Sequence, residues 1–142
     1  MKRSALWIFT LIIFMVSCGK SEKPVIQDDP NKTCVEILYF HGDMVCRNCV
    51  AMEKGISELL DNQYKEDVKA GRIIFKTVDI TTPEGEEIAD KYGVTWSSLF
   101  INNWKEGQEE RNDLTRMGMR YAAKDPETFK KEIANYIQGY LN

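Results

Sequence analysis

The chain has 142 residues and a formal net charge of −3, from 19 Lys and Arg against 22 Asp and Glu. This length fits one domain with short appendages, and a hydrophobic content of 43% suits an ordinary globular core. Because basic residues do not predominate, the composition argues against the positively charged surface of a nucleic-acid-binding protein, and we expect no nucleic-acid partner.

The N-terminal residues have the pattern of a signal peptide. Lys2 and Arg3 precede a nearly continuous apolar stretch over 5–16, which is shorter than the ~20 residues that span a bilayer. Residues 15–18, Met-Val-Ser-Cys, resemble a loose form of the bacterial lipobox. The resemblance implies cleavage before Cys18, lipidation of its thiol, and an anchored protein of the bacterial envelope. A plain secretory signal or an uncleaved anchor is the alternative.

We therefore divide the chain into a lipoprotein signal peptide (1–17), a flexible tether (18–33) and a folded domain (34–142). The tether is polar, and Pro24 and Pro30 interrupt any regular element in it. Export would place the domain in the periplasm or at the cell surface, where disulfides persist.

The domain begins with residues 35–41, which are rich in branched and aromatic types and predict a buried strand. After a turn at 42–45, apolar residues at helical spacing predict a helix that starts at Cys46 and continues until Gly71. A second strand is expected over 72–80.

A second helix is expected to start with Thr82 as N-cap and Pro83 in its first turn, and to end at Gly93. Two further strands, over 98–102 and 108–115, are joined by a tight turn.

A short helical stretch over 117–123 and a last helix, begun by Asp125 and Pro126, complete the domain. The order β-α-β-α-β-β-α predicts an α/β fold with a four-stranded mixed sheet and helices on both faces. The helical crossover implies a parallel first pair of strands, and the tight turn implies an antiparallel last pair.

The chemistry is expected at Cys46-Arg47-Asn48-Cys49. Dithiol exchange needs a nucleophilic thiolate and a second thiol within reach, and the start of a helix favours negative charge on the first sulfur. Cys46 is therefore the predicted nucleophile and Cys49 the resolving thiol. Arg47 favours the Cys46 thiolate, whereas a nearby Asp43 would oppose it.

A Cys-x-x-Cys pair has two other common roles. A zinc site needs two more ligands, and Cys34 and His41 stand over ~20 Å apart at opposite ends of one strand, so we expect no metal. A purely structural disulfide remains an alternative, and Cys34 itself is expected to be a small buried hydrophobe or to pair with another chain.

The element order, the thiol pair between first strand and first helix, and Lys91-Tyr92-Gly93-Val94 resemble thioredoxin over residues 34–142. Three features differ from the thioredoxin pattern. Val45 replaces the usual Trp, Arg47-Asn48 replaces Gly-Pro, and Ser98, preceded by Ser97, replaces the cis-proline that faces the thiols.

A closer resemblance rests on four segments: 40–42, 46–49, 91–94 and 119–126. They are similar to a thioredoxin-like family named for the nitrophenyl-compound nitroreductase subunit of arsenic-resistance operons, many members of which have lipoprotein leaders. This resemblance implies an electron-transfer or thiol role beside arsenic handling. The sequence has no Gly-rich phosphate loop for a flavin or nicotinamide, so we expect no cofactor.

Two functions follow as hypotheses. The first is an envelope thiol–disulfide redox protein, monomeric, which serves a redox partner protein connected with arsenic or nitroaromatic handling. The second is a non-catalytic carrier, because Ser98 in place of proline leaves space for arsenite or a soft metal at two thiolates.

His41 is a candidate proton relay for the thiols, with a backbone-bonded histidine as the equally weighted alternative. Trp96 is expected in the loop that faces Cys46, where it either packs or lines the substrate groove. The residues expected to face a substrate are Arg47, Asn48, Trp96, Ser97 and Ser98.

Overall fold

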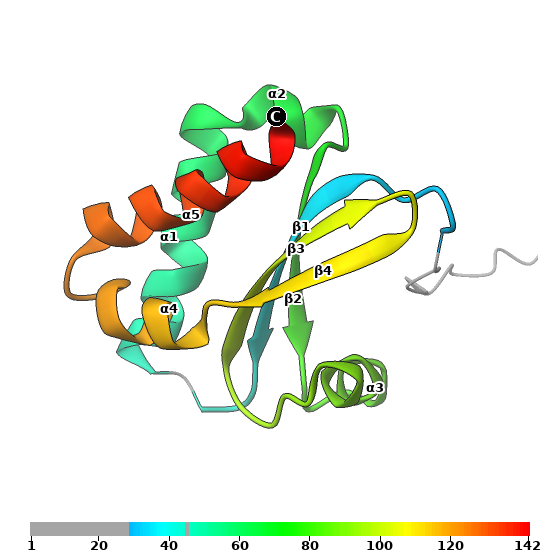
Figure 1. Cartoon of the computed structure of the whole chain (residues 1–142). Coiled ribbons are helices and arrows are strands. Elements are labelled where there is room, and N and C mark those ends of the chain that lie inside the picture. Colours follow the sequence, from blue (N-terminus) through cyan, green and yellow to red (C-terminus); the bar gives the residue numbers. More distant parts are fainter. Residues whose placement is uncertain (1–28, 45) are drawn as a thin grey trace, which may run out of the picture.

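The computed structural model describes residues 29–44 and 46–142 (Figure 1). The predicted signal peptide, the proposed lipidation residue Cys18 and most of the predicted tether lie outside the described residues, as does Val45. No helix within the described ranges is long and apolar enough to cross a membrane.

A four-stranded mixed sheet forms the centre of the domain (Figure 1). Its strands are β1 (Cys34–His41), β2 (Ile73–Asp79), β3 (Ser98–Lys105) and β4 (Gln108–Asp113). They lie in the order β2-β1-β3-β4, with β1 parallel to β2 and β3 antiparallel to both β1 and β4. The predicted fold class, with its parallel first pair and antiparallel edge, is confirmed.

Helices cover both faces of this sheet. They are α1 (Arg47–Gln63), α2 (Lys65–Lys69), α3 (Pro83–Tyr92), α4 (Thr115–Tyr121) and α5 (Pro126–Leu141). Helices α1, α4 and α5 lie on one face, and α3 lies alone on the other (Figure 1). The short helical stretch expected over 117–123 is thus α4, which begins two residues earlier.

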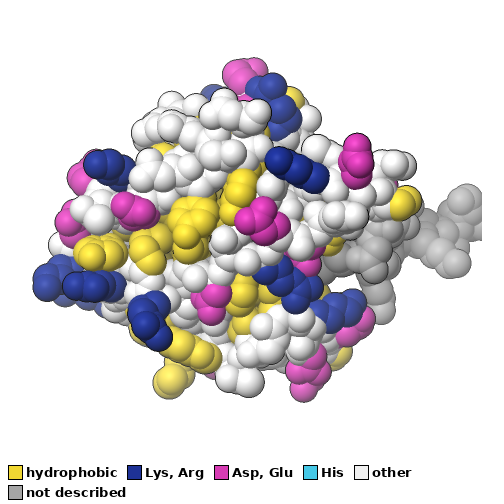
Figure 2. Space-filling model, in the orientation of Figure 1, with side chains coloured by type: hydrophobic (Ala, Val, Ile, Leu, Met, Phe, Trp, Pro, Cys, Tyr) yellow, Lys and Arg dark blue, Asp and Glu magenta, His cyan; other side chains and the backbone are white. Residues whose placement is uncertain are grey.

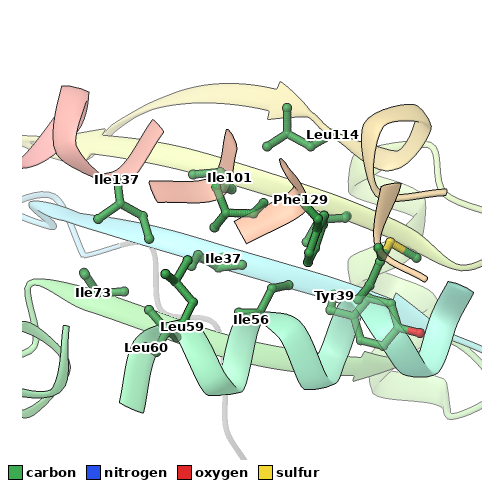
Figure 3. Close-up of a cluster of buried hydrophobic side chains, with 14 of the residues drawn as sticks. Ile37, Tyr39, Ile56, Leu59, Leu60, Ile73, Ile101, Leu114, Phe129 and Ile137 are labelled. Carbon is green, nitrogen blue, oxygen red and sulfur yellow. The ribbon is translucent and has the colours of Figure 1, made fainter. Parts of the chain in front are cut away.

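The central strand β1 is buried on both faces because its side chains alternate between two cores. Ile37 and Tyr39 belong to the core beneath α1 and α5, whereas Leu38 and Phe40 belong to the core beneath α3. Figure 3 shows the first core, where Ile56, Leu59 and Leu60 of α1 are turned toward Ile37 of β1 and toward Phe129 and Ile137 of α5. Each such side chain contributes about 1.5–3 kcal/mol when fully buried.

The predicted start signals of α3 and α5 and the predicted stop of α3 are confirmed. Thr82 Oγ1 accepts a hydrogen bond from the Gly85 N–H (3.1 Å), and Asp125 Oδ1 accepts one from the Thr128 N–H (3.1 Å). Gly93 ends α3 in the left-handed conformation (φ 65°) that glycine adopts without strain.

The first helix is shorter than predicted, because α1 ends at Gln63 and a separate turn of helix, α2, follows it. The backbone of Tyr64 leaves the helical conformation (φ −125°, ψ 18°). Its ring enters the first core, and its hydroxyl lies 3.5 Å from the carbonyl oxygen of Ala134 in α5. The break therefore depends on a contact with a residue 70 positions away, which local periodicity does not reveal.

The end of the predicted tether is packed against the sheet. The Gly107 N–H donates to the Lys32 carbonyl (3.0 Å), and the Glu106 N–H donates to Thr33 Oγ1 (3.1 Å). The Lys32 ammonium also lies 4.0 Å from the centre of the Trp104 ring. These side-chain and backbone contacts attach residues 32–33 to the sheet, directly before the predicted boundary at residue 34.

A buried carboxylate accounts for the Lys32 contact. Glu36, which is 2% exposed, accepts hydrogen bonds from Lys32 Nζ (2.9 Å), Lys76 Nζ (3.0 Å) and Trp104 Nε1 (2.8 Å). Burial by itself would raise the pKa of Glu36, but the two ammonium groups outweigh it and lower the pKa below the ordinary value. The network joins the N-terminal segment to β2 and β3 at the end of the sheet away from the thiol pair.

Candidate functional site

Cys46 and Cys49 form a disulfide at the junction of β1 and α1, with their Cα atoms 5.0 Å apart. Cys46 is the N-cap of α1, with an extended backbone (φ −104°, ψ 155°). Its Sγ accepts a hydrogen bond from the Cys49 N–H at 3.0 Å. The Cys49 N–H belongs to the first helical turn, where backbone N–H groups have no partner within the helix. It points at the first sulfur, as the sequence predicted, and this position favours a thiolate there.

The two cysteines differ in exposure. Cys46 is partly exposed, whereas Cys49 is 5% exposed and belongs to the core beneath α1. A second molecule therefore reaches the Cys46 sulfur before the Cys49 sulfur, which fits the predicted order of nucleophile and resolving thiol.

A mainly apolar groove of about 540 Å³ opens beside the disulfide. Two of its lining side chains protrude into solvent, Met44 with 87% and Trp96 with 57% exposure. Soluble proteins more often bury such side chains, so their exposure around a reactive group marks a binding surface. The lining residues are Gly42, Asp43, Met44, Cys46, Cys49, Ile80, Thr81, Thr95, Trp96, Ser97 and Met119.

The two serines of the loop before β3 have different surroundings. Ser97 lines the groove together with both sulfurs. Ser98 lines a neighbouring cleft instead, and its hydroxyl donates to the Trp96 carbonyl at 3.0 Å. Both serines are predicted to face a substrate, and of the two only Ser97 lines the groove beside the sulfurs. No cis peptide bond occurs in 29–44 or 46–142.

The other predicted site residues lie around the groove rather than in it. Arg47 is exposed and Asn48 is partly exposed on the first turn of α1. His41 ends β1, where its ring stacks on Tyr39 (centroids 6.1 Å apart) and its carbonyl accepts from the Ile80 N–H (2.9 Å). Neither contact is a hydrogen bond of a ring nitrogen, so both roles given for the His41 side chain, a proton relay and a ring bonded to the backbone, stay predictions.

Tyr39 lies in the core beneath the disulfide. It is 2% exposed and shares the core of Cys49. Burial raises the pKa of its hydroxyl, the charge of Glu53 raises it further, and a hydrogen bond with Ser97 partly offsets both. Tyr39 is therefore a neutral hydroxyl at physiological pH, held against the serine that lines the groove.

The sequence did not reveal the part of the groove that comes from distant segments. Met119 of α4 and Ile80 and Thr81 after β2 line it together with Met44. Helix α4 was expected, but its packing against α1 is a tertiary contact, and a methionine on a short helix gives no local signal of a binding role.

Cys34 is a free, buried thiol at the far end of β1 from the disulfide. Burial raises its pKa, which favours the unreactive thiol form. The expectation of a small buried hydrophobe is confirmed. In the described part of the chain, no three His, Cys, Asp or Glu side chains cluster in a way that could hold a metal ion.

Comparison with known proteins supports the fold. A thioredoxin from Thermus thermophilus aligns with a TM-score of 0.50 and 24% identity over 72% of this chain and 73% of that one. A thioredoxin from Fasciola hepatica aligns with a TM-score of 0.48 and 21% identity over 78% and 84%, respectively. No family model and no curated protein matches the sequence. The domain is thus thioredoxin-like in fold, with a Cys-x-x-Cys disulfide at the start of its first helix.

Proposed function

We propose that this protein is a thiol–disulfide redox protein that exchanges two electrons with a partner protein through Cys46 and Cys49. The observation that carries the proposal is the position of Cys46. The residue is partly exposed and lines an apolar groove, and its sulfur accepts a hydrogen bond from the Cys49 N–H. An inert structural disulfide has no need of such a groove.

In the reducing direction, the reaction begins with the dithiol form. The Cys46 thiolate attacks one sulfur of the partner's disulfide, which forms an S–S bond between Cys46 and the partner. The partner's second sulfur leaves as a thiolate and takes a proton from water. The helix start favours the attacking thiolate.

The second step releases the partner. Cys49 loses its proton to solvent and attacks the Cys46 sulfur, which restores the Cys46–Cys49 bond and frees the partner's first sulfur as a thiolate. The partner has gained two electrons and this protein has lost two. Run in reverse, the same steps oxidise a dithiol partner.

We further propose that the domain works in the bacterial envelope as a lipid-anchored monomer. The support is the lipobox-like segment 15–18 in the sequence. A link to arsenic or nitroaromatic handling rests on the resemblance of 40–42, 46–49, 91–94 and 119–126. Expression of the full chain with labelled palmitate tests the anchor: label should enter the wild type, and Cys18→Ala should remove it.

A redox titration tests the exchange. The full chain is equilibrated in glutathione or dithiothreitol buffers, and its thiols are trapped with a mass-tagged alkylating reagent. A reversible two-electron transition of the Cys46–Cys49 pair between about −300 and −100 mV is expected. The absence of any reversible transition in that window would rule the proposal out.

A second candidate is the thiol-based carrier of arsenite or a soft metal. Ser97, a small side chain, lines the groove beside both sulfurs, which leaves room for an ion at the dithiol. Calorimetric titration of the reduced chain with arsenite and with Cu(I) tests this candidate. Binding no tighter than that of free dithiothreitol would exclude it.

A further inference from the structure

A second cleft adjoins the groove of the disulfide. It has a volume of about 390 Å³ and shares Trp96 and Met119 with that groove. The two side chains are thus a common wall, with the sulfurs on one side and the cleft on the other. The cleft is lined by Tyr92, Gly93, Val94, Trp96, Ser98, Phe100, Asp113, Thr115, Arg116 and Met119.

Arg116 brings a free positive charge to this cleft. Its side chain is exposed, and it forms no ion pair with any residue in 29–44 or 46–142. Arg116 and Met119 stand three positions apart on α4, so their side chains lie on the same face of that helix. The two residues are therefore about one helical turn, roughly 5 Å, apart along the helix axis.

Two carboxylates line the clefts, and no ion pair within 29–44 or 46–142 joins either of them to Arg116. Asp113 lines the same cleft, and its Oδ1 accepts a hydrogen bond from the Thr115 N–H (2.8 Å) at the start of α4. Asp43 lines the other groove, on the far side of the shared wall.

Two further arginines stand on the helices that carry Met119 and the cysteines. Arg120 follows it on α4, and Arg47 follows Cys46 on α1. In the space-filling view, Lys and Arg side chains border apolar ones over α4 and the turn that follows it (Figure 2). These three arginines belong to a chain whose net charge is −3.

We infer that the two clefts together bind an extended, acidic segment of the redox partner, with Arg116 as the residue that selects it. The inference rests on the proposed exchange function. An apolar side chain beside the partner's cysteine occupies the groove between Met44 and Trp96. The partner segment then continues past Trp96 and Met119 at roughly 3.3 Å per residue. An acidic side chain about two to four residues beyond the partner's cysteine pairs with Arg116.

Two synthetic peptides serve as probes. Each has ten residues and one cysteine with a Leu beside it, held as a mixed disulfide with nitrothiobenzoate, and they differ only in Glu or Lys three positions from the cysteine. The reduced full chain transfers two electrons to either peptide, becomes the disulfide, and releases the peptide thiol and the coloured nitrothiobenzoate thiolate. The release gives the second-order rate constant.

We expect the Glu peptide to react about two- to fivefold faster than the Lys peptide, which is the size of effect of one partly exposed ion pair. Arg116→Glu should reverse this preference, and added salt should weaken it in the wild type. Lys105→Glu is the matched control, because it makes the same charge reversal at the opposite end of β3, and it should leave the preference unchanged.

Bis(2-hydroxyethyl) disulfide is small and uncharged, so its reduction tests the proposed exchange function without testing the selection by Arg116. Equal rates for the two peptides, or an unchanged preference in Arg116→Glu, would overturn the inference. If the small disulfide still reacts in that case, the proposed exchange function stands. Failure of the reduced chain to react with any of the three disulfides would overturn both.

Discussion

The backbone N–H of Cys49 donates a hydrogen bond to the Sγ of Cys46 at 3.0 Å. This one contact makes the two sulfurs unequal, because the first gains the stabilisation of the helix start and the second lies in the core. A negative charge that forms on reduction therefore settles on the exposed sulfur. The consequences for reactivity and stability are testable.

The first prediction concerns the division of labour between the thiols. Cys46→Ser should abolish the reduction of a small disulfide, because no nucleophile remains at the surface. Cys49→Ser should still attack once and then accumulate as a mixed disulfide, since nothing resolves it. Intact-mass spectrometry distinguishes the two variants. A stable adduct on Cys46→Ser, with none on Cys49→Ser, would contradict the assignment.

The second prediction concerns Cys34. Since burial raises its pKa and shields its sulfur, iodoacetamide at neutral pH should leave it unmodified in the native reduced chain while Cys46 is alkylated. In denaturant both should react. Cys34→Ala should leave the exchange rate unchanged. Rapid native labelling of Cys34 would show that this end of the sheet opens.

The third prediction concerns the buried carboxylate of Glu36. Glu36→Gln should lower the free energy of unfolding by about 1–3 kcal/mol at neutral pH, because hydrogen bonds from two ammonium groups lose their charged acceptor. Urea denaturation followed by circular dichroism measures the difference. Glu58→Gln is the control, because Glu58 pairs with Lys54 and Lys130 on the exposed helix surface and should change stability much less.

The same residue predicts a pH dependence. The pKa of Glu36 is lower in the folded than in the unfolded chain, so its contribution is complete above the unfolded value, ~4.3, and is lost as the pH falls through the folded value. The wild type should therefore lose more stability than Glu36→Gln between pH 7 and pH 3. Parallel curves for the two proteins would show that Glu36 has no such role.

The fourth prediction concerns Gly118, which lets α4 approach the core. A Cβ at this position would lie 2.3 Å from the Met52 sulfur, and Met52 is fully buried. Gly118→Ala should therefore cost about 1–3 kcal/mol by overpacking and should slow exchange, since α4 also carries Met119 of the groove. Gly139→Ala in α5 meets nothing within 4 Å and should instead stabilise the protein by up to ~1 kcal/mol.

Local signals identified most of the fold. Thr82-Pro83 and Asp125-Pro126 mark the starts of α3 and α5, and Gly93 marks an end, because caps and the left-handed conformation depend on nearest neighbours in the chain. The break at Tyr64 was missed, since it depends on core packing near Ala134.

In the candidate site, too, some residues follow from local sequence patterns and others only from tertiary contacts. The sequence alone predicted the pairing of Cys46 with Cys49 and a loop with Trp96 beside them, because a Cys-x-x-Cys at the start of a helix defines its own local chemistry. Only the tertiary structure decided that Ser97 rather than Ser98 faces the sulfurs, that Met44 and Met119 complete the groove, and that Arg116 stands across the wall. These residues meet because α4 packs against α1 and β3, and contacts between distant segments leave no pattern in the local sequence.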